Sequence, residues 1–287
     1  MNRQNYSVLS LTCCTLVALT GCGGSSIKDV TIPVISLEGS ANVSLEAGTA
    51  YTDAGATATD NIDGAITGSI VTVNPVDINT VGTYTVTYNV SDAAGNGATA
   101  VTRTVEVVES VLSGVFTDSA VEGLTYTTNT QSGVTDASGT FQYQAGESIA
   151  FSIGSFQLGE SATAAAEMTP LDLISGAVLP TTHNELLRLV NKTRQREPDA
   201  VAFTKLVNVL VFLQALDSDK DASNGITIAD GMGAIIDDVT IDITMTTDEF
   251  KSSTALIELM NAAVTAEVVS SGFIKSAGVA LIHFYEA

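Results

Sequence analysis

Residues 82–90 read GTYTVTYNV, and this stretch decides the fold of the first part of the chain. Its apolar and aromatic residues stand at 84, 86, 88 and 90, and they alternate with threonine or asparagine at 83, 85, 87 and 89. Successive side chains of a β-strand point to opposite faces, so the alternation predicts a strand with one buried face and one solvent-exposed face. Strands of this kind are typical of antiparallel sandwiches.

The surrounding residues 32–109 are rich in threonine, valine, glycine and alanine, and their apolar residues often alternate in the same way. We therefore expect this region to fold as an all-β sandwich. The chain has no tryptophan, and none of its cysteines lies in this region. The core of the sandwich is therefore expected to rest on the packing of valine, isoleucine and tyrosine.

Four phrases stand out in this region: PVI at 33–35, ATDNIDG at 58–64, GTYTVTY at 82–88 and SDAAGN at 91–96. In this order they resemble the bacterial immunoglobulin-like domain that is named after a pesticidal crystal protein. The resemblance implies a single sandwich, with Tyr84 at the tyrosine corner and Val86 where an antibody domain has its second cysteine. Such domains usually act as spacers or adhesive units on bacterial surface proteins.

Residues 111–171 form a second β segment, in which GVTDASGTF at 133–141 reads as strand, turn, strand. Aspartate and glycine supply the turn conformations, and threonine, valine and phenylalanine supply the flanking strands. The phrase resembles the small prealbumin-like sandwich of carboxypeptidase-regulatory modules. The resemblance implies a small second β sandwich in this part of the chain.

From residue 172 to residue 287 the composition favours helices, so we expect a mainly helical C-terminal domain. Thr182 and Glu185 have the spacing of a capping box, which predicts the start of a helix. Residues 200–216 are apolar on nearly every side and are expected to form the buried central helix. Amphipathic stretches at 248–263 and 276–285 can pack against it. The whole chain is therefore expected to be multidomain, with an immunoglobulin-like sandwich, a small β sandwich and a helical domain.

The region from residue 114 onward carries four further phrases: VEGLTY at 121–126, TDASG at 135–139, TPLDL at 169–173 and LDSDKDASNGI at 216–226. Together they resemble a module that is common in secreted and surface proteins of marine bacteria. The resemblance implies no particular activity.

The N-terminal segment has Arg3, then an apolar run over residues 8–19, and then LTGC at 19–22. The run is too short to span a bilayer as a mature helix, and the pattern resembles the lipobox of a bacterial lipoprotein signal peptide. The resemblance implies a signal peptide at 1–21, acylation of Cys22 with fatty acids such as palmitate, and a flexible tether at 22–31. The alternative is an ordinary secretory signal. Gly23, in place of aspartate, implies the outer membrane, where the protein faces either the periplasm or the cell surface.

The formal net charge of the chain is −21 at pH 7. Such a surface repels nucleic acid and anionic lipid headgroups, so we expect no nucleic acid partner. Attachment to the lipid bilayer must then come from acyl chains on Cys22 rather than from electrostatic attraction. Cys13 and Cys14 belong to the signal segment, so no disulfide can form within the mature chain.

The sequence contains no HExxH, no GxSxG, no glycine-rich phosphate loop and no cysteine after residue 22. His183, beside a helix start, and His283, in the last apolar stretch, are more often cap or core residues than bases. We therefore expect a non-enzymatic surface lipoprotein with an adhesive role, or one that binds a protein or carbohydrate partner. The alternative is an envelope-anchored hydrolase with catalytic carboxylates in the C-terminal region.

An acidic loop follows the predicted central helix, and its oxygen-bearing residues suit calcium. The expected ligands are Asp217, Asp219, Asp221, Asn224 and Asp230. The helix dipole and mutual repulsion both disfavour these acids unless a cation is bound. The spacing starts like an EF-hand loop, but Ala222 and Ile228 replace the required glycine and glutamate, so the loop is not an EF-hand. The alternatives are neutralisation by Lys220 and a plain solvated loop.

A second possible calcium site lies in the immunoglobulin-like region. Two loops that emerge at the same end of such a sandwich carry its expected ligands, Asp60, Asn61, Asp63, Asp92 and Asn96. The alternative is that these residues serve only as turn formers.

The first prediction concerns the anchor. Replacing Cys22 with serine should abolish incorporation of labelled palmitate, because the acylated sulfur is gone. Label that persists in Cys22→Ser would show that the lipid is attached elsewhere.

Overall fold

The computed structural model describes residues 28–286, so Cys22, Gly23 and the signal segment lie outside the described residues. The chain divides into two compact units. One unit comprises the described part of Met1–Val43 together with Thr52–Val76 and Tyr84–Val105. The other comprises Ser44–Tyr51, Asp77–Thr83 and the described part of Glu106–Ala287.

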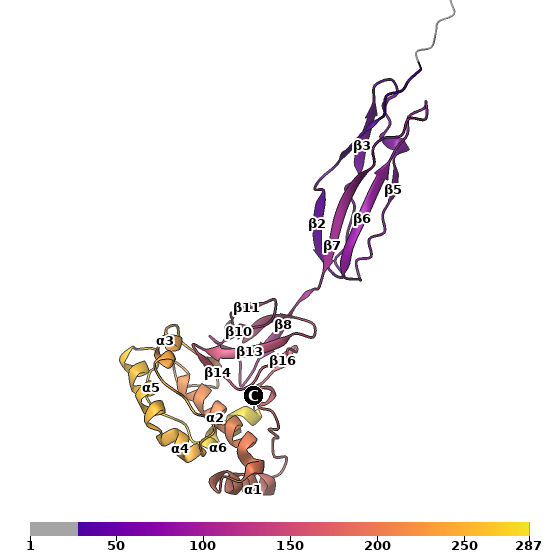
Figure 1. Cartoon of the computed structure of the whole chain (residues 1–287). Helices are drawn as coiled ribbons and strands as arrows, with labels where there is room; N and C mark the ends of the chain where they lie inside the picture. Colours follow the sequence, from indigo (N-terminus) through magenta and orange to yellow (C-terminus); the bar gives the residue numbers. More distant parts are fainter. Residues whose placement is uncertain (1–27, 287) are drawn as a thin grey trace, which may run out of the picture. The chain divides into compact units, whose positions relative to one another are not determined.

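The N-terminal region is a β-sandwich, as the sequence predicts (Figure 1). One sheet has the order β1 (Val34–Leu37), β3 (Ala56–Asp60), β4 (Gly64–Ala65), and the other has the order β2 (Asn42–Glu46), β7 (Val101–Val108), β6 (Gly82–Asn89), β5 (Val71–Val73). A short 3-10 helix, η1 (Thr67–Ser69), leads from β4 to β5.

The alternation along β6 is confirmed. Val86 and Tyr88 are completely buried, whereas Thr83 and Thr85 are exposed. The next inward residue, Val90, is also buried. Strand β6 therefore supplies one inner face of the sandwich with a continuous apolar row.

The sandwich core contains one polar group that the composition does not suggest, the guanidinium of Arg103 on β7. This side chain is 1% exposed. Its Nε donates to the Ser40 carbonyl at 2.8 Å, and its Nη2 donates to the carbonyls of Glu38 and Gly55. These three carbonyls flank β1 and β3 of the opposite sheet. Arg103 therefore bonds one sheet of the sandwich to the other.

An acid and a tyrosine complete the hydrogen bonding of this guanidinium. Nη1 forms an ion pair with Asp53 and donates to the Tyr88 hydroxyl at 2.9 Å. Tyr88 in turn donates to Asp53 at 2.5 Å. The expected core of valine, isoleucine and tyrosine is thus incomplete, because a buried ion pair also links the two sheets.

The second unit contains the remaining strands. One sheet has the order β11 (Ser132–Val134), β10 (Thr125–Thr127), β13 (Ser148–Ile153), β14 (Phe156–Gln157), with β15 (Ala162–Thr163) also on β13. Another has the order β12 (Thr140–Gln144), β8 (Val111–Phe116), β16 (Glu167–Met168). Finally, β9 (Val121–Glu122) pairs in parallel with β17 (Ile226–Thr227), which lies beyond α2 in sequence.

The turn at 136–139 is confirmed, but its two flanking strands do not pair with each other. Strand β11 joins β10, whereas β12 joins β8. Gly139 has φ +71°, and a Cβ at this position would lie 2.4 Å from the Phe116 carbonyl oxygen. The glycine is therefore required by backbone conformation and by space, and the turn carries the chain from one sheet to the other.

The helices follow the strands in sequence. They are α1 (His183–Arg194), α2 (Val201–Leu216), α3 (Met232–Asp237), α4 (Thr247–Ser252), α5 (Thr254–Thr265) and α6 (Ala277–Glu286), with short 3-10 helices η2 (Pro170–Leu173) and η3 (Pro198–Ala200). The capping box of Thr182 and Glu185 starts α1 as predicted. The stretch predicted as one helix at 248–263 is divided at Ser253, which ends α4 and caps α5.

Helix α2 is the buried centre that the sequence predicts. The segment Pro198–Leu216 is long and apolar enough to cross a membrane by length and composition, but 78% of its apolar window is buried within the protein. Burial on this scale is typical of the core helix of a folded domain.

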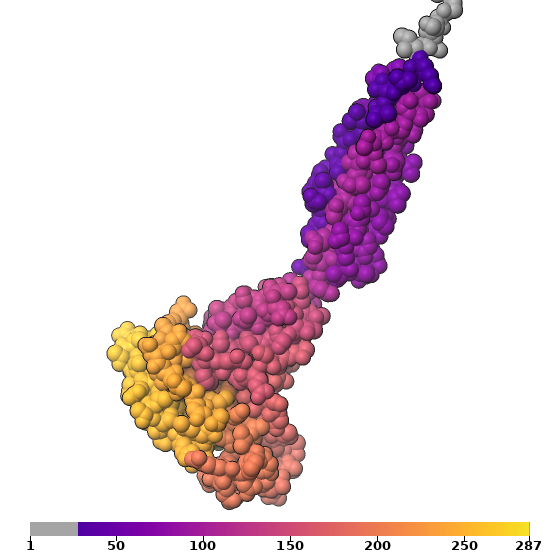
Figure 2. Space-filling view, in the orientation of Figure 1, coloured from indigo at the N-terminus to yellow at the C-terminus, as the bar shows by residue number. Residues whose placement is uncertain are grey.

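Strands and helices of the second unit share one hydrophobic core. Phe156 of β14 packs edge-on against Phe212 of α2 at 5.0 Å between ring centroids, and Phe212 packs against Phe250 of α4 at 6.3 Å. Among the strands, the ring centroids of Phe116 and Phe151 lie 4.5 Å apart. In Figure 2 the helical residues form one continuous body with the strands of this unit.

The second prediction concerns Arg103. Replacing it with methionine should lower the free energy of unfolding of the sandwich by about 3–5 kcal/mol, because Asp53 and several carbonyls lose their donor. Denaturant unfolding of the chain from residue 22, with Cys22→Ser, measures this loss. Thr102→Met, on the exposed face of the same strand, is the matched control. A loss below about 1 kcal/mol in Arg103→Met would contradict a linking role.

Candidate functional site

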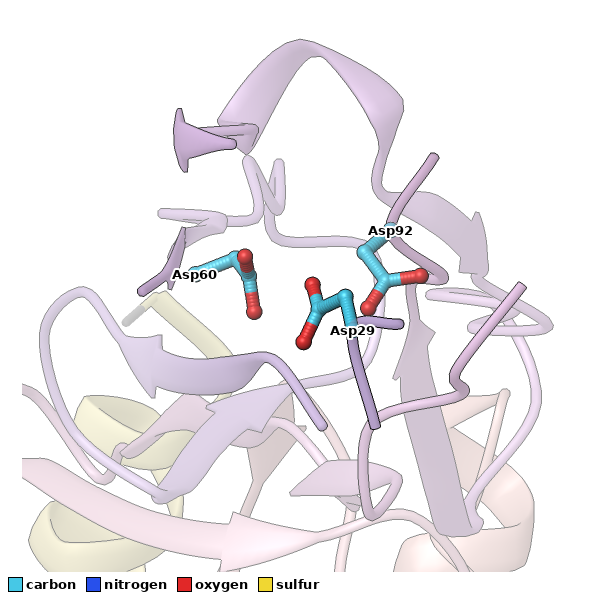
Figure 3. A group of neighbouring side chains, drawn as sticks. All are labelled: Asp29, Asp60 and Asp92. Atoms are coloured by element: carbon cyan, nitrogen blue, oxygen red, sulfur yellow. The ribbon is translucent and has the colours of Figure 1, made fainter. Parts of the chain in front are cut away.

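Three carboxylates gather at one end of the immunoglobulin-like sandwich. Asp60 ends β3, Asp92 follows β6, and Asp29 precedes β1. One carboxylate oxygen from each lies within 4.8 Å of the others. Figure 3 shows the three side chains facing one another across a small space. Only 9% of Asp60 and 8% of Asp92 is exposed, so two of the three acids are nearly buried.

The Asp60 carboxylate is held by its own loop. Its Oδ1 accepts hydrogen bonds from the backbone N–H groups of Ile62 at 2.8 Å and Asp63 at 3.0 Å. The N–H groups of Asp63 and Ile62 lower the pKa of Asp60, so the group is ionised at neutral pH. Its Oδ2 is buried and accepts no hydrogen bond within residues 28–286. The loop thus fixes the direction of this carboxylate and leaves one oxygen without a partner.

The two predicted loops meet, as the sandwich topology implies. Asp63 accepts a hydrogen bond from the Ala93 N–H at 2.8 Å, which joins one loop to the other. Asp92 accepts from both the backbone N–H and the side-chain amide of Asn96, each at 2.7 Å. Asn61 is exposed on the surface of its loop. Asp63 and Asn96 therefore support the cluster, and Asn61 is not part of it.

Asp29 was missed by sequence reasoning because it falls in the stretch 22–31, which composition suggested was a flexible tether. Its carbonyl accepts from the Asn96 amide at 3.2 Å, and its carboxylate accepts from the Thr31 N–H at 3.0 Å. The available signal was its position a few residues before the PVI phrase, where the chain must pass the end of the sandwich.

The predicted calcium loop at the end of α2 has a different arrangement. Asp217 caps the helix, is 1% exposed and accepts from the Thr227 N–H at 3.1 Å. Asp219 accepts from the Asn224 amide at 2.9 Å and from the Asp221 N–H at 2.8 Å. In the described residues, Asp217, Asp219 and Asp221 do not form a group of three oxygens within 4.8 Å. Asp230 lies before α3, beside Gly231.

The contacts of Lys220 favour the alternative in which this lysine, rather than a metal ion, neutralises the acids of the loop. Its Nζ donates to the carbonyl of Ala215 near the end of α2. Burial lowers the pKa of Lys220 to about 8, and the nearby charge of Asp217 opposes this shift. A protonated lysine at this place offsets both the helix dipole and the acids. Calcium at this loop remains a prediction that no observation tests.

Asp118 is a buried acid that sequence reasoning did not single out. It is completely buried, and burial raises its pKa to about 7. Within the described residues neither of its carboxylate oxygens has a hydrogen-bond partner, and the same is true of Gln214 Oε1. The Gln214 side chain lies beside Asp118, and its amide donates to the Ala280 carbonyl at 3.3 Å. Burial therefore outweighs the Gln214 side chain and the charge of Lys275, which both lower the pKa of Asp118.

The two histidines lie on α1 and α6. His183 is exposed in the first turn of α1. His283 lies on α6, where its Nε2 is 3.0 Å from the Ser119 Oγ and 3.3 Å from the Asp118 carbonyl oxygen.

Two surface hollows of the helical region are lined by acids that already form hydrogen bonds or ion pairs. One hollow is lined by Glu185 and Asp199, and another by Asp242 and Glu249. Glu185 accepts hydrogen bonds from Thr181 and Thr182, and Asp199 forms an ion pair with Lys192. Asp242 accepts from Thr244, and Glu249 is bonded to Thr246 and Arg196. These hydrogen bonds lower the pKa of all four carboxyls. Acids of this kind are poor proton donors at neutral pH.

Residues 35–107 match the family model described as "Bacterial surface protein, Ig-like domain". This match confirms the resemblance seen in the four sequence phrases, and it identifies the sandwich that carries Asp60 and Asp92 as an immunoglobulin-like domain of bacterial surface proteins. No curated protein matches the chain.

Two solved structures are similar over part of the chain. The lipoprotein BT2262 from Bacteroides thetaiotaomicron is 23% identical over 42% of this chain and 56% of its own, with a TM-score of 0.25. A structure of the CBM51-2, in complex with GlcNAc, and INT domains of Clostridium perfringens ZmpB is 17% identical over 42% of this chain and 28% of its own, with a TM-score of 0.23. This chain thus covers less than two thirds of either structure, and the TM-scores are too low to inform its function.

The third prediction concerns Asp118. The folded protein retains a proton there that the unfolded chain loses near pH 4, so the contribution of Asp118 to stability should fall as the pH rises from about 4 to about 7, by about 1.4 kcal/mol per pH unit. Asp118→Asn should remove this contribution. Denaturant unfolding across that range measures the difference between the two proteins. Asp136→Asn, on an exposed turn, is the control, because the Thr140 N–H lowers the pKa of Asp136 and gives the opposite slope at acid pH. If the free energy of unfolding changed with pH in the same way for wild type and Asp118→Asn, the raised pKa of Asp118 would be contradicted.

Proposed function

We propose that this protein is a non-enzymatic, envelope-anchored surface protein whose immunoglobulin-like domain serves as a spacer or adhesive unit. The observation that carries the proposal is the match of residues 35–107 to the immunoglobulin-like domain of bacterial surface proteins. The remaining fold, with its shared core and central helix α2, forms a second unit that can present a surface to a protein or carbohydrate partner.

The state of the acids supports binding rather than catalysis. A general acid needs a pKa near the operating pH and access to substrate. Glu185, Asp199, Asp242 and Glu249, which line two hollows of the helical region, have lowered pKa values and intramolecular partners. Asp118 has a raised pKa but is completely buried.

The anchor is proposed to be acylated Cys22 at the outer membrane. The net charge of −21 supports this assignment, because a strongly acidic protein is repelled by anionic headgroups and needs a covalent lipid to stay at the bilayer. The charge also disfavours nucleic acid as a partner.

The fourth prediction tests binding against catalysis. The chain from residue 22, with Cys22→Ser, is incubated with a panel of polysaccharides and with envelope fractions, and both retention and turnover are recorded. We expect retention by at least one fraction without release of soluble products. Turnover would support the alternative, an envelope-anchored hydrolase.

Paired variants show which hollow is responsible if turnover is observed. Glu185→Gln with Asp199→Asn alters one hollow, and Asp242→Asn with Glu249→Gln alters the other. Turnover that disappears in either pair would place catalysis in that hollow and overturn the proposal. Absence of retention by every polysaccharide and envelope fraction would overturn the partner-binding role.

A further inference from the structure

We propose that Asp29, Asp60 and Asp92 bind one divalent cation of the calcium type, and that this cation fastens the segment before β1 to the end of the immunoglobulin-like domain. The evidence for the cation site is the arrangement of the three carboxylates and does not depend on the proposed function. Its consequence for the anchor, which follows below, rests on the envelope anchoring proposed above.

The first argument is charge. The three carboxylates have oxygens within 4.8 Å of one another, and two of these residues are more than nine-tenths buried. Like charges at this distance repel strongly where water is partly excluded. The ion pairs formed by residues 28–286 involve none of the three. Arg103, the next basic residue in sequence after Lys28, is bound to Asp53 in the core. A bound cation would remove the repulsion.

The second argument is the unpartnered oxygen of Asp60. Its Oδ2 is buried and accepts no hydrogen bond within the described residues, although the Oδ1 of the same group accepts two. A buried acceptor without a partner is costly. The Asp60 side chain faces Asp29 and Asp92 in Figure 3. The loop therefore holds an ionised carboxylate toward the other two acids while one of its oxygens remains available as a ligand.

The chemistry of the donors selects the class of ion. All three side chains offer carboxylate oxygens, which are the ligands of hard cations, and cysteine or histidine is absent from this group. The donors come from two loops and one irregular segment, and calcium tolerates irregular geometry better than magnesium does. Extracellular calcium modules bind with Kd values of about 10⁻⁴–10⁻³ M, and an affinity in this range is expected here.

The position of Asp29 determines which parts of the chain a bound cation would link. Asp60 and Asp92 belong to loops that Asp63 already joins through the Ala93 N–H. Asp29 lies on the segment that precedes β1, and its carbonyl accepts a hydrogen bond from the Asn96 amide. A cation shared by all three acids adds a strong link between this segment and the domain. Where the N-terminus is acylated, the cation would therefore shorten the free tether.

Calcium titration by calorimetry tests the site, with the chain from residue 22 carrying Cys22→Ser. We expect binding to the unchanged chain, and binding about tenfold weaker or more in Asp29→Asn, Asp60→Asn and Asp92→Asn. Glu106→Gln, on the exposed face of β7, is the matched control and should bind like the unchanged chain, whereas Asp219→Asn tests the acidic loop after α2. Hydrogen exchange supplies the second readout: calcium should slow exchange of the amides at 29–32 at least severalfold, and not in Asp60→Asn.

Several results would overturn the proposal. They are no calcium heat at millimolar concentration, unchanged affinity in Asp29→Asn, loss of binding in Asp219→Asn alone, and exchange at 29–32 that calcium does not alter. Exchange in β6 and β7 of the sandwich reports whether each variant is folded, so that loss of binding is not mistaken for unfolding. Retention by polysaccharides or envelope fractions is measured separately without calcium, so the two proposals can fail independently.

Discussion

The two sheets of the immunoglobulin-like domain are joined by a buried guanidinium where related architectures use a disulfide or a tryptophan. Burying a charge is costly unless it is paired and fully hydrogen-bonded, and Arg103 meets that condition with Asp53, Tyr88 and three carbonyls. One of those carbonyls belongs to Gly55, directly before β3, and Asp60 ends the same strand. The buried guanidinium thus holds the start of the strand whose last residue is Asp60.

Acids with little solvent exposure in the described part of the chain are stabilised by several means. Asp53 has an arginine, Asp60 has the N–H groups of its own loop, and Asp118 holds a proton because burial raises its pKa. Asp217 is partly balanced by Lys220, whose own pKa is lowered by burial. A chain with so few basic residues cannot pair every acid with a cation. Backbone donors, protonation and, under the proposal made above, a metal ion take the place of arginine and lysine.

Local patterns predicted the strands and helices well, because alternation and capping boxes are local. Strand β6, the start of α1 and the buried helix α2 all follow the pattern read from the sequence. Partners distant in sequence were not predictable in this way: the parallel pairing of β9 with β17 has no local signal. Arg103 did leave a signal, since it shares the inward face of β7 with Val105 and Val107, but a charged residue was not expected in a core. The two loops of the acidic cluster were predicted from topology, whereas Asp29 was assigned to a tether by its composition.

The burial of Arg103 also affects how the chain withstands digestion. Lys28 and Arg103 are the only lysine or arginine residues from position 28 to position 187, and Arg103 is 1% exposed. Trypsin-like proteases cleave after these two residue types and need the side chain in their specificity pocket, so an enclosed arginine offers them no substrate while the sandwich is folded. The stretch from residue 29 to residue 187 is therefore intrinsically resistant to this class of protease. For a protein displayed outside the cytoplasm, a scarcity of basic residues would then protect the chain as well as set its charge.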